Sequence, residues 1–172
     1  MTKARNHPKA ASVWDEVAEL KREKILQSAV DLFYTNGYLP TTMDVIAESI
    51  GATKPFVYYH YENKAELLSE IARRTLREWL AVTTRVIETS LPPTETLALA
   101  TREFTMIVLD MYKLVSIYFR EQLNLPKEVA AEIAEMRRQI DSQVRMILSE
   151  GKKVGAFEFD DLAVARDRKS VV

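Results

Sequence analysis

The sequence predicts an all-α fold for its 172 residues, and three observations support that class. Apolar residues recur at every third or fourth position along most of the chain, which is the period of an amphipathic helix. No alternation of apolar and polar residues runs beyond four positions, so strands are not predicted. Proline and glycine fall mainly between the helical runs, where they begin or end helices.

An N-terminal arm precedes the first predicted helix. Residues 1–17 are polar and contain Pro8, so we expect a flexible arm there. Ile25 and Phe33 lie on one apolar face of a helix over residues 18–36. The Asn36-Gly37 pair then ends that helix.

Two short helices joined by a tight turn are predicted next. The first spans Met43 to Ile50, and Gly51 ends it because glycine enters the left-handed conformation without steric cost. Thr53 can cap the second helix, and Pro55 fits its first turn. Such a pair forms a helix-turn-helix, whose second helix enters the major groove of DNA. The buried stripe of the first helix is predicted to comprise Val45, Ile46, Ala47 and Ile50.

The second short helix carries residue types suited to DNA contact. Val57 and Tyr58 are expected to supply its buried side. On the remaining surface, the ammonium group of Lys54 can reach a phosphate or a guanine edge. The hydroxyl of Tyr59 can donate to a phosphate, and Phe56 can contact a thymine methyl group.

Four further residues complete the predicted interface. Thr42 begins the first short helix, so its hydroxyl and the free backbone N–H groups can meet a phosphate. Lys64 adds a second cation at the start of the next helix. Thr42 and Thr53 can instead serve only as caps, and His60 can pack internally or contact a phosphate. The predicted DNA-binding residues are Thr42, Thr53, Lys54, Phe56, Tyr59, His60 and Lys64.

The rest of the chain predicts further helices. A long helix begins near Lys64 with Asn63 as its cap and ends before the Pro92-Pro93 pair, and Thr94 can cap the helix that follows. The apolar segment 97–123 is too long for one ordinary helix, so we divide it near residues 109–112. A helix is predicted over residues 127 to about 153, and Gly151 and Gly155 end it. A last helix is predicted to begin at Leu162, with Asp160 or Asp161 as its cap.

From Leu20 to Leu68 the chain resembles the TetR family of bacterial repressors. The resemblance implies a three-helix DNA-binding domain over residues 18–63, with Lys54 to His60 as its recognition helix. It also implies a helical domain over residues 64–172 that binds a small effector and forms a homodimer on a palindromic operator in double-stranded DNA. Tyr61 stands where the family usually has Phe, and Pro55 where Gly is common. The matching residues are Gly37-Tyr38, Thr42, Ile46-Ala47-Glu48, Gly51, Tyr58-Tyr59-His60 and Lys64 to Leu67.

The C-terminal half carries a second, weaker resemblance. The stretches YFREQLNLP and EGKKVGAFEFDD are similar to TetR-family repressors of fatty-acid and aryl-acid degradation. That similarity implies a hydrophobic acid or an acyl-CoA as effector. Family members usually carry two more long helices after the position of Phe159, where about a dozen residues remain here. Apolar residues of this half also suit an ordinary core, and Arg120 can equally pair with Glu121. The candidate effector-binding residues are Trp79, Phe104, Met111, Tyr112, Phe119, Arg120, Met136 and Ile140.

Composition limits the alternatives. The chain lacks cysteine, which excludes a disulfide framework, a thiolate metal site and a cysteine nucleophile. Its net charge is −1, so bulk charge gives no sign of a nucleic-acid partner. Charged residues interrupt its most apolar stretch, so we do not expect a membrane span. We expect the protein to be cytoplasmic. An effector-free architectural DNA binder would share the reading helix but need no cavity. An all-α enzyme is disfavoured, because His7 and His60 are the only histidines and no catalytic, metal or cofactor motif can be assembled.

Overall fold

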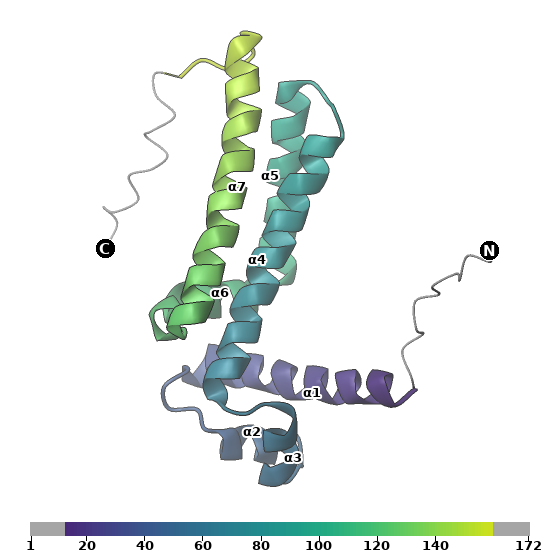
Figure 1. Ribbon diagram of the computed structural model, residues 1–172, viewed down its shortest axis with the longest axis vertical. Helices are drawn as coiled ribbons and strands as arrows, with labels where there is room; N and C mark the ends of the chain where they lie inside the picture. The colour runs from purple at the N-terminus through teal and green to yellow at the C-terminus, as the bar shows by residue number, and fades with distance from the viewer. Residues whose placement is uncertain (1–12, 160–172) are drawn as a thin grey trace, which may run out of the picture. The chain divides into compact units, whose positions relative to one another are not determined.

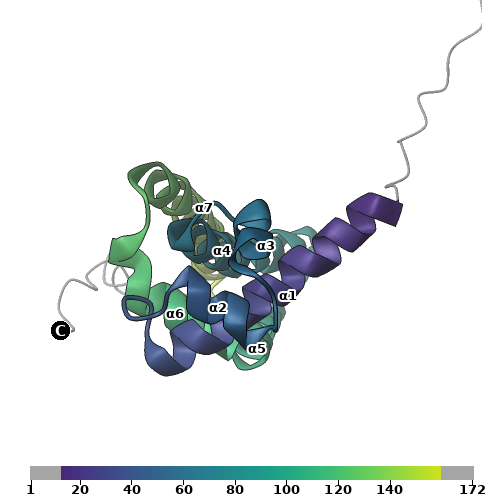
Figure 2. The same ribbon diagram turned by 90° about the horizontal axis from the view of Figure 1, so that it is seen from below.

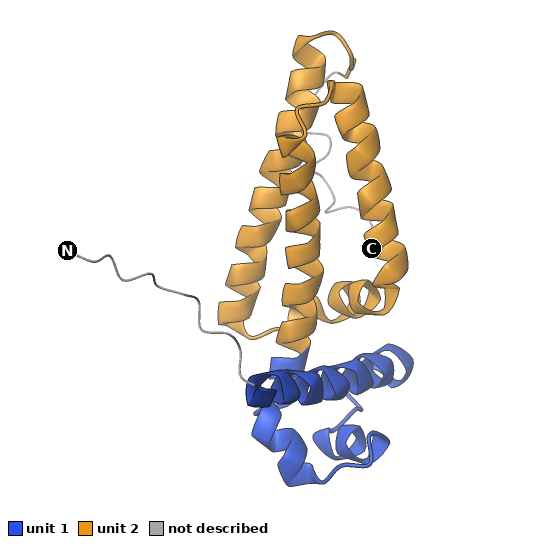
Figure 3. Cartoon of the chain, turned by 90° about the vertical axis from the view of Figure 1, so that its right-hand side faces the viewer, with its two compact units in different colours: residues 1–67 blue, residues 68–172 orange. Residues whose placement is uncertain are grey.

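Amphipathic helices build both parts of the chain in a computed structural model that describes residues 13–159. Two compact units are distinguished, residues 1–67 and residues 68–172, and helix α4 begins in the first and continues in the second (Figure 3). The all-α prediction is confirmed over the described residues, which contain no strand. The elements are α1 (Val13–Asn36), α2 (Met43–Ser49), α3 (Lys54–His60), α4 (Lys64–Glu88), α5 (Pro93–Asp110), α6 (Tyr112–Glu121), the 3-10 turn η1 (Gln122–Asn124) and α7 (Lys127–Lys153) (Figure 1).

Helix α1 begins earlier than predicted. It starts at Val13, so the expected arm over residues 1–17 is wrong for its last five positions. Asp15 and Glu16 lie in the first turn, where carboxylates interact favourably with the positive end of the helix. The first twelve residues of the predicted arm lie outside the described part of the chain.

The core of unit 1 brings α1, α2 and α3 together. Ile25, Phe33, Ile46 and Val57 are completely buried, and they come from all three helices. Fully burying one such side chain stabilises a fold by about 1.5–3 kcal/mol, so these contacts fix α3 against α1 and α2. Figure 2 shows α2 and α3 lying next to each other.

The turn between α2 and α3 follows the predicted chemistry. Gly51 has a φ of +66°, and its N–H donates to the Glu48 carbonyl at 3.0 Å. The N–H of Ala52 donates to the Ala47 carbonyl at 2.9 Å, which completes a Schellman motif. Val45 differs from prediction, because Met43, Ile46 and Ala47 form the buried stripe and leave Val45 38% exposed.

Helix α4 is capped as predicted. The side-chain oxygen of Asn63 accepts a hydrogen bond from the Glu66 N–H at 3.0 Å, and the Glu66 carboxylate accepts one from the Glu62 N–H at 2.7 Å. Unit 1 extends to Leu67 rather than ending at residue 63. The extension has a physical reason, because the first turn of α4 is tied to α1 and to the α1–α2 connection through Glu66 and Lys64.

Unit 2 packs the remaining helices around an apolar core. Ala72, Leu76, Tyr118, Ile133 and Ile140 are buried in one cluster contributed by α4, α6 and α7. Polar contacts reinforce the pairing of α4 with α7. The Arg73 guanidinium lies 2.9 Å from the Glu132 carboxylate, and Gln143 donates to the Thr84 hydroxyl at 2.9 Å.

The helix boundaries of unit 2 largely agree with the sequence analysis. Met111 separates α5 from α6 where a break was predicted, and α7 has the predicted span. Thr94 does not cap α5, because that helix already begins at Pro93. Gly151 lies inside α7 instead of ending it, and the Phe157 ring occupies the space that a Cβ atom at Gly151 would need. The predicted helix from Leu162 lies outside the described residues. Among the helices that the structure describes, none is both long and apolar enough to cross a membrane.

Candidate nucleic-acid interface

Helix α3 presents two candidate contact residues to solvent. Tyr59 is 84% exposed, and the Lys54 side chain is 57% exposed. Val57 is completely buried and anchors the helix. Tyr58 was predicted to be buried but is 43% exposed, because a step of one residue turns it about 100° from Val57 around the helix axis. The exposed surface of α3 is therefore richer in phenol groups than the sequence suggested.

His60 takes the internal alternative. Its side chain is buried, with ring centroids 5.1 Å from Phe56 and 5.0 Å from Tyr59. Burial lowers the pKa of His60, and the positive charges of Lys21 and Arg22 lower this pKa further. The imidazole is therefore neutral at neutral pH. Of the two alternatives for His60, burial favours packing, and its contact with a phosphate stays a prediction.

Lys54 is held by a neighbouring carboxylate. Its ammonium nitrogen lies 2.9 Å and 3.0 Å from the two carboxylate oxygens of Asp44 in α2. The hydrogen bond and the negative charge of Asp44 raise the pKa of Lys54. The same nitrogen lies 5.8 Å from the centre of the Tyr58 ring. The cation nearest to the start of α3 thus has an internal counterion.

Lys64 has internal partners as well. Its ammonium group donates to the backbone carbonyls of Tyr38 at 2.8 Å and Leu39 at 2.9 Å. It also lies 4.4 Å from the centre of the Tyr38 ring. These contacts join the start of α4 to the connection between α1 and α2. Lys64 therefore has a structural role that the sequence did not reveal, while its phosphate contact stays a prediction.

The two threonines and Phe56 occupy the edges of this surface. Thr42 is exposed, and its hydroxyl oxygen accepts a hydrogen bond from the Val45 N–H at 3.3 Å. Thr53 is exposed at the N-cap position of α3, where its side chain makes no capping hydrogen bond. Phe56 is half-buried, and the Lys21 ammonium lies 5.9 Å from its ring centre.

Sequence reasoning missed Arg22, which organises the base of the interface. Its guanidinium donates to the His60 carbonyl, lies 3.7 Å from the Glu66 carboxylate and stacks 4.1 Å from the centre of the Tyr61 ring. The Tyr61 hydroxyl in turn donates to the Arg22 carbonyl at 3.4 Å. The one available signal was its position, a single turn before the buried Ile25 on the same helix face.

All eight effector candidates lie in unit 2, and five of them belong to or adjoin one aromatic cluster. Rings from α5 and α6 surround Trp79 of α4, with centroid distances of 5.9 Å to Phe104, 6.4 Å to Tyr118 and 5.9 Å to Phe119. Met136 and Ile140 belong to the adjoining core cluster. The indole N–H of Trp79 is buried and has no hydrogen-bond partner within residues 13–159. We call these four rings the Trp79 cluster.

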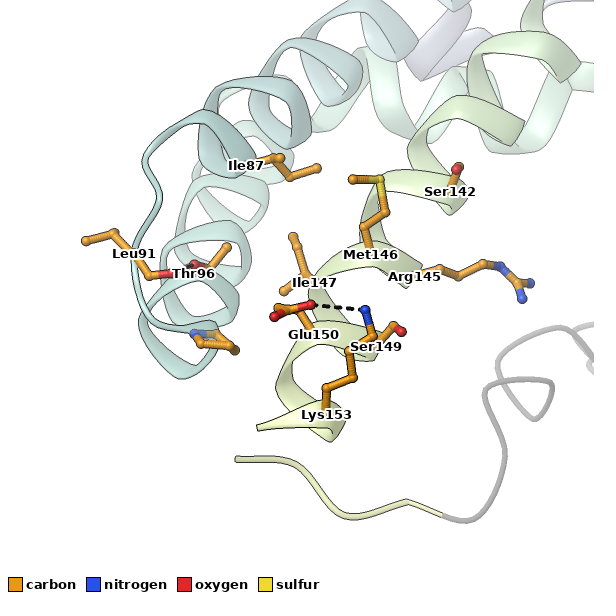
Figure 4. A pocket seen from close by; sticks show the side chains of 11 residues that line it. Ile87, Leu91, Thr96, Ser142, Arg145, Met146, Ile147, Ser149, Glu150 and Lys153 are labelled. Atoms are coloured by element: carbon orange, nitrogen blue, oxygen red, sulfur yellow. Dashed lines mark hydrogen bonds and ion pairs between the residues drawn. The ribbon is translucent and has the colours of Figure 1, made fainter. Parts of the chain in front are cut away.

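Cavities in unit 2 do not coincide with most of the candidates. One of about 570 Å³ lies between α7 and the region joining α4 to α5, with Ile87 and Leu91 across from Met146 (Figure 4). Another of about 410 Å³ lies between α5 and α7 and includes Phe104 and Val144. Of the eight candidates, Phe104 alone lines either of these cavities, and effector binding stays a prediction for all eight. The candidates that line neither cavity are Trp79, Met111, Tyr112, Phe119, Arg120, Met136 and Ile140.

Physical reasons account for the candidates outside the cavities. The rings of the Trp79 cluster pack against one another, with the Tyr118 and Phe119 centroids 5.3 Å apart. Tyr112 and Phe119 are about half-exposed, and Arg120 pairs with the Glu121 carboxylate at 3.3 Å. No group of acidic or histidine side chains able to hold a metal ion occurs within residues 13–159.

A helix-turn-helix followed by an all-helical second unit defines a class of DNA-binding transcriptional regulators. Residues 25–71 match the family model described as "Bacterial regulatory proteins, tetR family", and residues 90–167 match "Tetracyclin repressor-like, C-terminal domain". Together the two matches cover more than half of the chain. The chain belongs to the TetR family of transcriptional regulators, which bind operator DNA and typically dimerise.

Named relatives agree with this assignment. The chain is 29% identical over 142 residues to the uncharacterized HTH-type transcriptional regulator YhgD of Bacillus subtilis, covering 80% of this chain and 72% of that protein. It is 44% identical over 46 residues to IcaR of Staphylococcus epidermidis, a negative regulator of the biofilm operon icaADBC, covering 27% of this chain and 25% of that protein.

Solved structures are similar over most of the chain. The TetR-family regulator PfmR from Thermus thermophilus has a TM-score of 0.76 at 26% identity, covering 82% of this chain and 77% of that one. The structure of AibR in complex with isovaleryl coenzyme A and operator DNA has a TM-score of 0.73 at 25% identity, covering 84% and 78%.

Proposed function

We propose that the protein is a repressor that reads its operator with α3 and leaves it when a small hydrophobic effector binds unit 2. The observation that carries the DNA contact is the exposure of Lys54 and Tyr59 on a helix anchored by the buried Val57. An exposed phenol and an exposed ammonium group match the donors that contact phosphates and base edges.

Two copies of the chain would act together. A homodimer presents two α3 helices to successive major grooves, so the operator would be palindromic with half-sites about 34 Å apart. Family membership supports this arrangement. Exposed apolar side chains on unit 2, among them Met106, Leu109 and Met146, supply surface for contact between copies.

Selection of DNA duplexes from a random pool tests the DNA-binding proposal. The full chain is expected to enrich a palindrome whose half-sites are separated by about one helical turn. A pool that stays random after repeated rounds at moderate salt would contradict sequence-specific binding. Enrichment of bent or A·T-rich DNA without a palindrome would instead favour an architectural DNA binder.

The Trp79 cluster supports the effector class. A buried donor without an acceptor is costly, at about 1–3 kcal/mol, so a ligand carbonyl that accepts from the Trp79 N–H would recover this loss. The cavity between α5 and α7 meets the cluster at Phe104 and is lined almost entirely by apolar side chains. An acyl group bearing a carbonyl fits this combination, and the AibR complex with isovaleryl coenzyme A supplies a family precedent.

Tryptophan fluorescence tests the effector without DNA. The sequence contains Trp14 and Trp79, so Trp14→Phe leaves Trp79 as the sole emitter. Titration with isovaleryl-CoA and with longer acyl-CoAs is expected to change the Trp79 emission, and CoA alone is expected to leave it unchanged. Trp79→Phe keeps the ring but removes the N–H, so it should weaken binding about fivefold in a thermal-shift titration. No response to any acyl-CoA would contradict this class and favour an effector-free regulator.

A further inference from the structure

The helix-turn-helix has no net positive charge with which to attract DNA, because its carboxylates outnumber its ammonium groups. Residues 41–64 contain the carboxylates of Asp44, Glu48 and Glu62 against the ammonium groups of Lys54 and Lys64. Lys64 already donates to two backbone carbonyls. Lys54 is therefore the cation of α3, and its surroundings decide how this helix meets a polyanion.

Asp44 is placed to neutralise that cation. It lies in the first turn of α2, ten residues before Lys54, and the turn at Gly51 brings the two side chains within 2.9 Å. The Asp44 side chain is 59% exposed and the Lys54 side chain 57% exposed. The pair therefore lies at the surface that α3 offers to DNA, and an approaching phosphate would meet the carboxylate together with the ammonium group.

We propose that Asp44 is a specificity-determining residue, which cancels the charge of Lys54 and leaves this lysine to act as a hydrogen-bond donor to a base edge. The inference rests on the proposed contact of α3 with DNA. An ammonium group has three N–H donors, so Lys54 can keep Asp44 and still donate to the O6 or N7 of a guanine. A phosphate contact depends on charge, which the carboxylate opposes. Asp44 thereby reduces sequence-independent binding more than it reduces binding to the operator.

The electrostatics of DNA give the size of the effect. Each lysine that neutralises a phosphate adds about 0.9 to the slope of log affinity against log salt concentration. At about 0.1 M salt one such contact corresponds to roughly a fivefold to tenfold gain in affinity. Asp44→Asn, which has the same shape without the charge, should release Lys54 to make this contact.

The experiment measures the binding of the full chain to a selected operator and to a scrambled duplex over a range of salt concentrations. Asp44→Asn is expected to bind the scrambled duplex fivefold to tenfold more tightly, with a slope steeper by about 0.9, and to discriminate less between the two duplexes. Asp44→Ser should give the same gain. Glu48→Gln is the matched control, because it removes one exposed carboxylate from the same helix without touching Lys54, and it should give a smaller gain with little change in slope.

A double-mutant cycle assigns the gain to Lys54. In Asp44→Asn combined with Lys54→Gln, the extra affinity for the scrambled duplex should disappear. The proposal is overturned if the double variant keeps the gain, if Asp44→Asn behaves like Glu48→Gln, or if it loses affinity only for the operator. Failure of the proposed α3 contact has a separate signature, in which Lys54→Gln alone leaves operator affinity unchanged.

Discussion

Replacing Lys64 by methionine tests whether this lysine secures the fold or clamps DNA. Methionine keeps most of the apolar stem and removes the ammonium group, which donates to the Tyr38 and Leu39 carbonyls. Hydrogen bonds from charged donors contribute about 1.5–3 kcal/mol each, and partial exposure of Lys64 reduces that value. We therefore expect Lys64→Met to lower the free energy of unfolding by about 2 kcal/mol in total.

Urea denaturation and DNA binding together separate the two roles. With an m-value of about 2 kcal/mol per molar urea, the unfolding midpoint should fall by about 1 M. Lys24→Met is the control, because Lys24 is an exposed lysine of α1 and its change should leave the midpoint in place. An unchanged midpoint for Lys64→Met, accompanied by a salt slope lower by about 0.9 in DNA binding, would refute the structural role and support a phosphate clamp.

Two further predictions concern the same unit. Gly51→Ala should lower the free energy of unfolding by about 1–2 kcal/mol, because the φ of +66° disfavours an L side chain although no atom lies within 4 Å of the added Cβ; an unchanged urea midpoint would contradict this. The lowered pKa of His60 means that the unfolded chain takes up a proton more readily than the folded one as the pH falls below about 6.5. The contribution of the neutral His60 to stability should therefore be fully present above this pH and be lost as the pH falls below it. Between pH 7.5 and pH 5.5, the urea midpoint of His60→Gln should fall less than that of the unaltered protein. Equal falls in the two midpoints would contradict the effect of burial.

The parts of the fold with local signals could be predicted from the sequence. Gly51 ends α2, Asn63 caps α4 and Met111 separates α5 from α6, and each of these features depends on residues within a few positions. The start of α1 was predicted five residues too late. Before residue 18 the apolar residues lose their regular helical spacing, although residues that form helices continue. Local rules therefore place helices better than they place the ends of helices.

The candidate site could be predicted only in part. The exposure of Lys54 and Tyr59 follows from the position of the helix-turn-helix, whereas the burial of His60 depends on α1, which contributes Arg22 from 38 residues away. The ion pair between Asp44 and Lys54 depends on how the turn aligns two helices, which no spacing rule specifies. In unit 2, the sequence identified aromatic residues as candidates for effector binding. Whether each of them fills the core or lines a cavity depends on side-chain packing, which the sequence pattern does not specify.

The central claim is that the exposed face of α3 contacts DNA, and Tyr59→Ala tests it most directly. Tyr59 is 84% exposed, so its truncation should leave the urea midpoint unchanged. The affinity for a selected operator duplex, measured by fluorescence anisotropy at fixed salt, should fall about fivefold for each half-site. Tyr112→Ala, which removes an exposed tyrosine from α6, should bind like the unaltered protein. Equal operator affinities for Tyr59→Ala and Tyr112→Ala would contradict the claim.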